Sequence, residues 1–421
     1  MGGGLIQIVA YGSQDIYLTG NPQITFFKVV YKRHTNFAIE SIEQTFNGSV
    51  NFGNTITCEL SRNGDLVNRM YLQVELPGLI QVGNNGSAST FVHWVNNFGN
   101  AMIKKLELFI GGQLIDSHYG EWLDIWSELN IGTDQKISYN KMIGNFETNA
   151  AIIENSSNPS RYYVPLQFFF NRNAGLALPL IALQYHEVVF KLEIENLDNL
   201  VKSDVILNNP VQDNNGDIAT ITSCSLWVDY IYLDTDERRR FSQIRHEYLI
   251  EQVQHLGSET IPINATSKKV NINYNHPVKS IYWVIQDNTY LTSNALNGNE
   301  KLRYVCSTAN NIDTFETAKL VLNNSDRFKE RNADYFRLVQ HYQHSKVSTL
   351  KIIYSYSFAL RPYEHQPSGT CNFSRLDSSH LLFTFNPVNH TADVQRTIKV
   401  YAINYNVLRI TSGMGGVAFS N

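Results

Sequence analysis

The chain has 421 residues, more than one hydrophobic core usually supports, so two domains of roughly 200 residues each are expected. Hydrophobic residues make up 43% of it and charged residues 17%, which excludes a disordered chain and a coiled coil. The formal net charge of −4 excludes an overall basic excess of the kind that neutralises nucleic-acid phosphates.

The amino-terminal residues predict an extended strap. The apolar stretch 5–10 is shorter than a signal-peptide core and no basic residues precede it, so secretion is not indicated. Gly12, Gly20 and Pro22 interrupt the segment that follows, which is typical of a chain segment without a core of its own. The most apolar window of the chain, residues 175–183, is too short to span a bilayer.

Apolar and polar residues alternate with a period of two in several stretches. In residues 70–76 the apolar side chains at even-numbered positions would point to one face, as a half-buried antiparallel strand requires. The same pattern predicts strands at residues 188–194, 226–232 and 352–358. We therefore expect a mainly β fold.

Pairs of residues that tolerate positive φ separate these stretches and predict turns. The sharpest signal is Asn63-Gly64-Asp65, which predicts a hairpin between residues 56–60 and 66–76. Further turn pairs are Asn47-Gly48, Asn85-Gly86, Gly111-Gly112, Asn215-Gly216 and Asn297-Gly298.

Helical periodicity is scarce. Trp122, Ile125 and Leu129 fall at a spacing that makes one apolar stripe on a short helix over residues 119–130. A second short helix is predicted over residues 236–246, with Thr235 as its cap.

Each half of the chain ends on a long predicted strand, residues 225–233 in the first half and 397–410 in the second. The charged residues 234–240 follow the first of these strands, so we place the domain boundary near residue 237. Many short strands with long loops favour tandem β-sandwiches of the jelly-roll kind over an alternating βα fold.

A resemblance carries the interpretation further. Residues 11–28, YGSQDIYLTGNPQITFFK, and 31–38, YKRHTNFA, closely resemble the amino-terminal segment of the major capsid proteins of nucleocytoplasmic large DNA viruses. Further similar segments are IGGQLID at residues 110–116, WVDYIYLDTDERRRF at 227–241, CNFSRLD at 371–377 and GMGGVAF at 413–419.

The resemblance implies an all-β fold of two tandem antiparallel eight-stranded jelly rolls, a double jelly roll, with short helices in the loops. We expect an amino-terminal arm at residues 1–23, a first jelly roll at 24–236, and a second jelly roll with the carboxyl-terminal tail at 237–421. It also implies a structural capsid protein of the virion, assembled in the host cytoplasm, whose homotrimeric, pseudo-hexagonal capsomers tile an icosahedral shell. No enzymatic activity and no cofactor are expected.

The implied partners are further copies of the chain, neighbouring capsomers and minor capsid proteins, with no direct contact to nucleic acid. A peripheral contact with an inner viral membrane stays open. The alternatives are a jelly-roll lectin or attachment protein, and a minor capsid protein. In the family the arm lies at the base of the capsomer, and the assembly residues that we carry over are Gly12, Asp15, Tyr17, Gly20, Asn21 and Pro22.

Asn-x-Ser/Thr sequons in predicted loops are candidate glycosylation sites, at Asn85, Asn155 and Asn323. His341 and His344 have a helical i, i+3 spacing, but with no carboxylate or cysteine at a matching offset we assign no metal.

No nucleophile elbow or phosphate-binding glycine motif occurs, and the cysteines stand far apart as reduced thiols. The charged residues 234–240 are interpreted as a solvated junction rather than a cation or phosphate site. We interpret the aromatic runs 162–163 and 168–170 as a trimer contact.

Overall fold

The structure is a computed structural model that describes residues 3–80, 92–203, 211–292, 300–304, 313–347, 349, 351–385 and 395–420. The chain divides into two compact units, Met1–Asn36 and Phe37–Asn421. The first unit contains two short helices, α1 (Gly3–Val9) and α2 (Ile16–Thr19). Every β-strand of the described residues belongs to the second unit, which we call the body.

Two antiparallel sheets form the first half of the body. One has the strand order β1-β11-β3-β7 and the other has the order β2-β9-β5-β6. The first comprises β1 (Phe37–Thr45), β11 (Ser223–Leu233), β3 (Leu66–Leu76) and β7 (Ser160–Pro165), with β8 (Leu178–Pro179) beside β3. The second comprises β2 (Thr55–Glu59), β9 (Val188–Ile194), β5 (Ile103–Ile110) and β6 (Gln113–His118). A separate ribbon pairs β4 (Val92–Trp94) with β10 (Val201–Ser203).

The second half of the body has the same construction. One sheet comprises β12 (His246–Ile261), β21 (Arg396–Thr411), β14 (Pro277–Asp287) and β18 (Tyr354–Ser357), with β19 (Cys371–Asn372) and β22 (Met414–Val417) attached. The other comprises β13 (Ser267–Asn271), β20 (Ser379–Thr384), β15 (Thr317–Leu322) and β16 (Ser325–Asp326), with β17 (Arg331–Asn332) beside β15.

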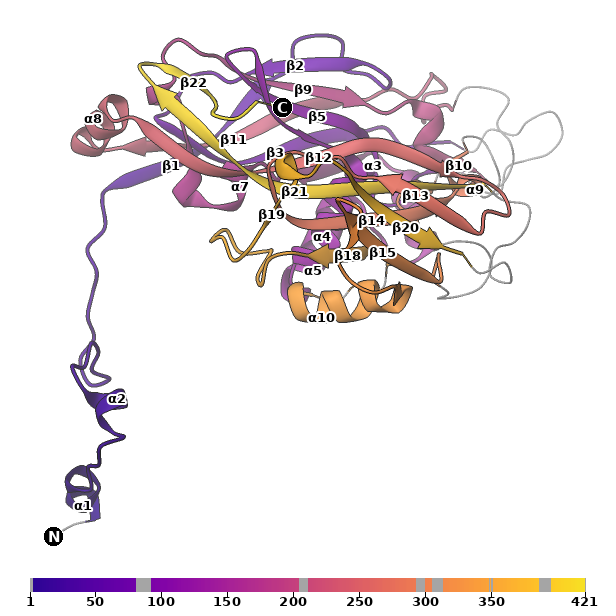
Figure 1. Cartoon of the computed structure of the whole chain (residues 1–421). Coiled ribbons are helices and arrows are strands. Elements are labelled where there is room, and N and C mark those ends of the chain that lie inside the picture. The colour runs from indigo at the N-terminus through magenta and orange to yellow at the C-terminus, as the bar shows by residue number, and fades with distance from the viewer. Residues whose placement is uncertain are drawn as a thin grey trace. The chain divides into compact units, whose positions relative to one another are not determined.

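The two halves share one topology. If the eight main strands of each half are numbered in chain order, the two sheets read 1-8-3-6 and 2-7-4-5 in both halves. This is the jelly-roll arrangement, in which successive strands cross between two facing sheets. The indigo-to-pink strands of the first jelly roll and the orange and yellow strands of the second lie beside each other in the body (Figure 1). The expected double jelly roll is therefore confirmed.

The helices lie in the connections between strands and are short. Those of the first half are α3 (Phe98–Ala101), α4 (Gly120–Asn130), α5 (Thr133–Ile143), α6 (Asn149–Ser156) and α7 (Phe169–Arg172). The junction carries α8 (Thr235–Gln243), and the second half carries α9 (Asn288–Leu291) and α10 (Gln340–His344). Tighter 3₁₀ turns are at Ala174–Leu176, Leu180–Ala182, Leu197–Asn199 and Phe373–Arg375, and a π-helical turn precedes α10 at Tyr335–Val339. In the described part of the chain, no helix is long and apolar enough to cross a membrane.

The two predicted helices are present as α4 and α8. The second begins one residue earlier than predicted, and its cap is Asp234 rather than Thr235, since the Asp234 carboxylate accepts a hydrogen bond from the Glu237 backbone N–H at 3.1 Å. Asp234 is therefore fixed in a structural role at the start of α8.

Three of the four predicted alternating strands are confirmed as β3, β9 and β11. The prediction for residues 352–358 is wrong in two respects, the length of the strand and the exposure of one of its faces. The strand β18 is shorter, and Ile353 and Ser355, on the face expected to be polar and exposed, are buried. Ile353 belongs to the same hydrophobic cluster as Trp122, Ile125 and Leu129 of α4, so this outer face of the sheet is covered by a helix from the other jelly roll.

The predicted hairpin at Asn63-Gly64-Asp65 is also wrong. The strand β2 pairs with β9, whereas β3 pairs with β11, so the turn carries the chain from one sheet to the other. Asp65 pairs instead with Ile231, to whose carbonyl its backbone N–H donates at 3.0 Å. A β-carbon at Gly64 would lie 2.8 Å from the Tyr230 side chain, so this glycine is needed for close packing between neighbouring segments.

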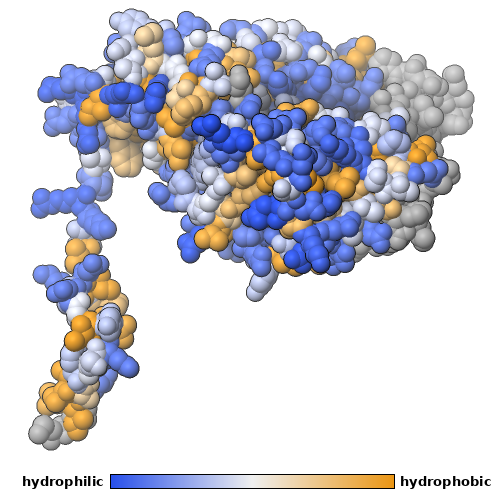
Figure 2. Space-filling view, viewed as in Figure 1, coloured by the Kyte–Doolittle hydropathy of each residue, from blue (hydrophilic) through white to orange (hydrophobic). Residues whose placement is uncertain are grey.

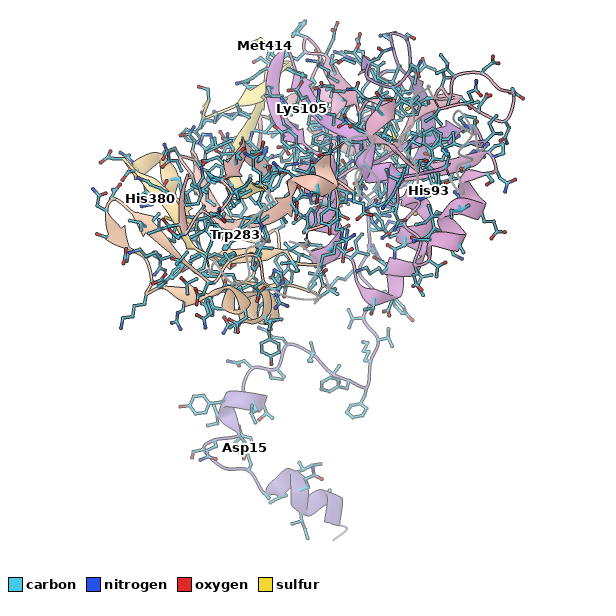
Figure 3. The ribbon with its side chains drawn as sticks, turned by 90° about the vertical axis from the view of Figure 1, so that its right-hand side faces the viewer. Asp15, His93, Lys105, Trp283, His380 and Met414 are labelled. Atoms are coloured by element: carbon cyan, nitrogen blue, oxygen red, sulfur yellow. The ribbon has the colours of Figure 1, made fainter. Side chains whose placement is uncertain are left out.

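The space between the facing sheets is filled by large apolar side chains. In the second jelly roll, Trp283 is fully buried and its ring centroid lies 5.2 Å from that of Phe336 and 6.2 Å from that of Phe383 (Figure 3). In the first, Phe168, Phe169 and Phe170 are at most 3% exposed. The interpretation of residues 168–170 as a trimer contact is therefore wrong, because their rings are already buried within the chain.

The Gly111-Gly112 turn between β5 and β6 gives a matched pair of stability predictions. Both residues have positive φ. A β-carbon at Gly111 would overlap the His186 ring, whereas a β-carbon at Gly112 would have no other atom within 4 Å. We expect Gly112→Ala to cost about 1–2 kcal/mol through backbone strain alone. Gly111→Ala adds a steric term of about 1–3 kcal/mol. Thermal unfolding should rank the variants in this order, and equal losses would contradict the structure.

Candidate assembly elements and the joint between the jelly rolls

Helix α4 belongs to the first jelly roll but buries its apolar stripe against the second. Trp122, Ile125 and Leu129 form a hydrophobic cluster with residues of β12, β14 and β21. The Trp122 ring lies 5.7 Å from the rings of both Tyr282 and Tyr401. Since Trp122 is only 1% exposed, this helix is a wedge that holds the two jelly rolls together. We call this region the joint.

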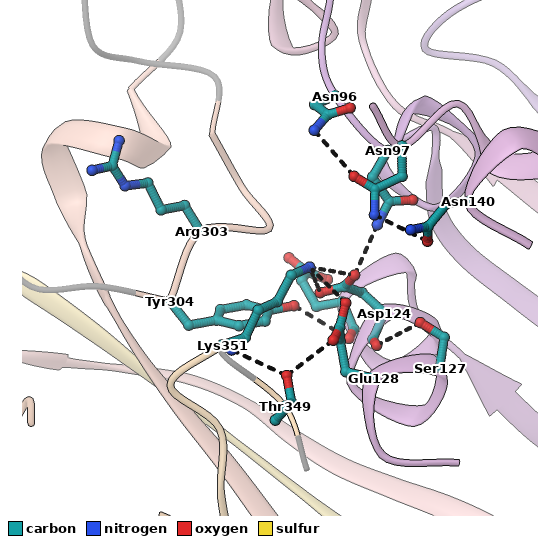
Figure 4. Close-up of polar contacts among 12 residues, drawn as sticks. Asn96, Asn97, Asp124, Ser127, Glu128, Asn140, Arg303, Tyr304, Thr349 and Lys351 are labelled. Carbon is teal, nitrogen blue, oxygen red and sulfur yellow. Dashed lines mark hydrogen bonds and ion pairs between the residues drawn. The ribbon is translucent and has the colours of Figure 1, made fainter. Parts of the chain in front are cut away.

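The same helix carries a row of acidic residues beside its apolar stripe. The Glu121 carboxylate lies 2.5 Å from the Lys399 ammonium, and the Asp124 carboxylate lies 2.6 Å from the Lys351 ammonium. Glu128 accepts a hydrogen bond from the Thr349 hydroxyl at 2.9 Å (Figure 4). The lysines and the threonine come from the second jelly roll, so charged contacts cross the joint alongside the apolar ones.

Burial shapes the ionisation of these groups. It raises the pKa of Asp124 above the ordinary 3.8, and the nearby Lys351 ammonium only partly opposes this. For Glu121 and Glu128, burial also favours the neutral form, but the lysine partners outweigh it and the pKa of each falls below the ordinary 4.5. The row therefore depends on its lysine partners to keep its glutamates charged.

Further ion pairs cross between the jelly rolls. Glu251 on β12 contacts Arg172 of α7 at 3.0 Å and also Lys279 on β14 at 2.5 Å. The Lys301 ammonium lies 2.6 Å from the Glu195 carboxylate, and Lys202 pairs with Glu300. Pairs that are this well enclosed are costly to break, because the remaining charge stays partly buried.

These contacts predict that acid weakens the body. The pKa values of Glu121, Glu128, Glu195 and Glu300 are all lowered, because cationic partners outweigh burial. The unfolded chain therefore takes up protons at these groups before the folded chain does, so their stabilisation is present above about pH 4.5 and is lost as the pH falls further. The raised pKa of Asp124 has the opposite effect on stability, but it is a single group against the four glutamates. Thermal unfolding at constant ionic strength should show a melting temperature that falls from pH 5 to pH 3, and an unchanged or rising value would contradict this linkage.

Two long strands also join the cores. Ile398 and Val400 on β21 belong to the core of the second jelly roll, whereas Leu408 and Ile410 on the same strand belong to the core of the first. Ile250 on the neighbouring strand β12 also packs into the first core. The strand β21 therefore contributes to the cores of both sandwiches and connects them directly.

The arm residues carried over from the family build local structure in the first unit. The Asp15 carboxylate accepts the Gly12 backbone N–H at 2.7 Å and so closes the turn before α2, where Figure 3 labels it. A β-carbon at Gly20 would collide with the Ile16 carbonyl oxygen, and Asn21 has a left-handed φ of 50°. Tyr17 is 91% exposed and Pro22 is also exposed. Their assembly role stays a prediction.

In residues 5–36 of the first unit, no large apolar side chain is buried. Phe26, Phe27 and Tyr31 are each at least 87% exposed, and hydrophobic residues are prominent along this segment in Figure 2. The other exposed large apolar residues of the unit are Leu5, Ile6, Ile8, Val9, Tyr11, Ile16, Tyr17, Leu18, Ile24, Val29 and Val30. A segment of this composition gains stability only when another surface covers it.

The candidate glycosylation sites lie in different settings. Asn85 lies outside the described residues. Asn155 is half-buried at the end of α6, and its amide donates to the Tyr162 hydroxyl at 2.6 Å, so a glycan would displace this bond. Asn323 is exposed, and its side-chain oxygen accepts the backbone N–H groups of Asp377 and Ser378, which leaves its amide nitrogen out of these bonds. Glycosylation stays a prediction, and Asn323 has the more favourable geometry of the two.

The remaining candidates are placed as structural residues. His341 is buried and its pKa falls to about 4, chiefly through burial and then through Arg337, whereas His344 contacts the Leu360 carbonyl. Arg238 of the junction pairs with Asp65 at 3.0 Å. Within the described residues, no group of three or more His, Cys, Asp or Glu side chains could hold a metal ion.

Cys58, Cys224 and Cys371 are free thiols, as expected, whereas Cys306 lies outside the described residues.

Comparison with known proteins agrees with the fold. Residues 25–234 match the family model of the major capsid protein N-terminus, and residues 237–416 match that of the large eukaryotic DNA virus major capsid protein. The major capsid proteins of Pyramimonas orientalis virus and Paramecium bursaria Chlorella virus 1 are 45% and 42% identical, each over the full length of both chains.

Solved structures show the same similarity. The crystal structure of VP54 of PBCV-1 has a TM-score of 0.77 at 36% identity, covering 94% of this chain and all of that one. The Faustovirus major capsid protein has a TM-score of 0.75 at 14% identity, covering 95% of this chain and 94% of that one, and shows the likeness of fold alone. With both halves matched and full-length relatives above 40% identity, the chain belongs to the major capsid protein family of large eukaryotic DNA viruses, whose place is the shell of the virion.

Proposed function

We propose that three copies of this chain form a capsomer of pseudo-hexagonal outline, and that these capsomers tile an icosahedral shell. The observation that carries the proposal is the repeated strand order, because one chain then presents two similar blocks and a three-fold trimer presents six. The role is structural, and its chemistry is burial and shape complementarity rather than catalysis. The relatives are capsid proteins, and one similar structure, 36% identical, is described as a quasi-atomic model of the PBCV-1 virus capsid.

The joint supports this role, because a shell block must keep its outline under lateral load. Apolar packing around α4, ion pairs from Lys351 and Lys399, and the long strands β12 and β21 all oppose motion between the jelly rolls. We further propose that the chain is organised as an arm at residues 1–23 and jelly rolls at 24–236 and 237–421.

Electron microscopy of the purified full-length chain tests the proposed capsomer. Particles viewed down their symmetry axis should show a near-hexagonal outline with three-fold symmetry. Particles containing only two blocks, or rings of another symmetry, would contradict it.

The arm is proposed to order on assembly, against neighbouring capsomers or minor capsid proteins, with a peripheral membrane contact as the other option. Its exposed aromatic and aliphatic residues support this role. Trypsin can release it by cutting after Lys28, Lys32 and Arg33, which lie between the proposed arm and the first strand, β1. In the free chain these sites should be cut well before sites in the body, and in assembled shells they should be protected. An arm that resists trypsin in the free chain as long as the body does would contradict the prediction.

A further inference from the structure

The joint contains a cleft whose lining is suited to a ligand. Its volume is about 420 Å³, in the range of small-molecule sites, and it is lined by residues of both jelly rolls. The aromatic side chains of Trp126, Tyr282 and Tyr363 contribute to its walls. Several side-chain amides complete the lining, from Asn130, Gln135, Gln167, Asn171 and Asn173.

The lining has a strong positive excess. Four cationic side chains contribute to it, those of Arg69, Arg172, Lys279 and Lys346, while Glu251 is its one carboxylate among the described residues. Four positive charges against one negative charge leave a net charge of +3 without counting His365, which also lines the cleft.

Part of this excess is buried. Lys279 is 1% exposed, and its ammonium lies 2.5 Å from one oxygen of Glu251, whereas the other oxygen lies 3.0 Å from the Arg172 guanidinium. One carboxylate therefore serves two cations. Burial lowers the pKa of Lys279, and the repulsion of Arg172 adds to that effect. An anion bound nearby would relieve the imbalance.

The other two cations are available to a ligand. Arg69 and Lys346 are exposed, and neither makes an ion pair with any residue in the described part of the chain. The Lys346 ammonium lies 5.7 Å from the centroid of the Tyr363 ring. Exposed cations in the lining of a cleft with a net positive charge attract an anion from solution and then pair with it.

We propose that this cleft binds a small, multiply charged oxyanion, such as an organic phosphate or a polycarboxylate, whose uncharged part packs against the aromatic walls. Arg69 and Lys346 would pair with the charged group, and the amide side chains would supply further hydrogen bonds. Because the ligand would touch both jelly rolls, its binding should stabilise the joint. The proposal does not depend on the trimer.

Isothermal titration of the full-length chain with pyrophosphate, at constant ionic strength in chloride, tests the site, and a parallel titration with citrate separates phosphate from carboxylate ligands. We expect saturable binding at one site per chain. The double variant Arg69→Gln/Lys346→Gln should weaken it at least tenfold, because the charge-assisted hydrogen bonds of two cationic side chains to the anion are lost. The matched control is Lys269→Gln/Arg375→Gln, which also removes one exposed lysine and one exposed arginine, neither of which lines the cleft.

Three outcomes would overturn the proposal. The first is the absence of saturable binding of either anion at millimolar concentration. The second is an equal loss in both double variants, which would indicate non-specific charge attraction. The third is binding that is unaffected by the Arg69 and Lys346 substitutions. As an independent measurement, pyrophosphate should raise the melting temperature of the wild-type chain and of the control variant, but not that of the cleft variant.

Discussion

Replacing Trp122 by alanine is expected to lower the free energy of unfolding by about 3–5 kcal/mol, the range for removing a large aromatic side chain from a core. The indole is 1% exposed and packs between Tyr282 and Tyr401, which belong to the other jelly roll. Its loss would leave a cavity inside the joint, so both sandwiches would lose support. Denaturant unfolding followed by fluorescence measures the change.

Two further variants give this prediction its controls. Trp122→Phe keeps part of the aromatic packing and should lose less than Trp122→Ala. Leu114→Ala removes an apolar side chain that is 44% exposed, and should change the free energy by no more than about 0.5 kcal/mol. A loss at Trp122 as small as that at Leu114 would show that α4 does not hold the jelly rolls together.

Replacing Lys351 by methionine should cost about 2–3 kcal/mol. The substitution keeps most of the aliphatic stem but leaves Asp124, 1% exposed, without its ammonium partner at 2.6 Å. Breaking a fully buried pair costs about 3–5 kcal/mol. The Lys351 side chain is 28% exposed, so solvent screening reduces the effect.

The matched control is Lys104→Met. Lys104 also lies 2.6 Å from a carboxylate, that of Glu193, but the two side chains are 53% and 35% exposed. Its loss should cost at most about 1 kcal/mol, as for other surface pairs. Equal losses in the two variants would mean that the charges of the joint are solvated and contribute little.

The strands were predictable wherever one face of a sheet lies on a core and the other on solvent. That condition holds for β3 and β9, whose burial alternates as the sequence pattern predicts. It fails for β18, because α4 covers the outer face and makes Ile353 as buried as its neighbours. When a distant part of the chain covers the outer face of a strand, both faces are buried, and the strand's own sequence need not alternate between apolar and polar residues.

Strand pairing was not predictable from the turns. Asn63-Gly64 between two strand patterns is typical of a hairpin, yet a jelly roll sends successive strands to opposite sheets, and the same residues then serve at a crossing. The local pattern favoured tandem jelly rolls without giving their strand pairing, and the resemblance to capsid proteins supplied the double jelly roll as a whole. It rests on a long amino-terminal motif, whose Gly12, Asp15 and Gly20 shape the arm itself.

The joint was missed for a related reason. Glu121, Asp124 and Glu128 lie at i, i+3 and i+7, beside the apolar stripe that predicted α4. This spacing was a readable signal, but charged residues on a short helix are usually solvated. The lysine partners of Glu121 and Asp124, Lys399 and Lys351, lie more than 200 residues away in sequence, so only the folded chain reveals these pairs.

The mass of the purified chain in solution tests most directly whether this double jelly roll is built to close on two copies of itself. Size-exclusion chromatography with light scattering should give a mass near three times 48.0 kDa, independent of dilution over the working range. A stable species of 48.0 kDa would contradict the trimer and, with it, the six-block capsomer.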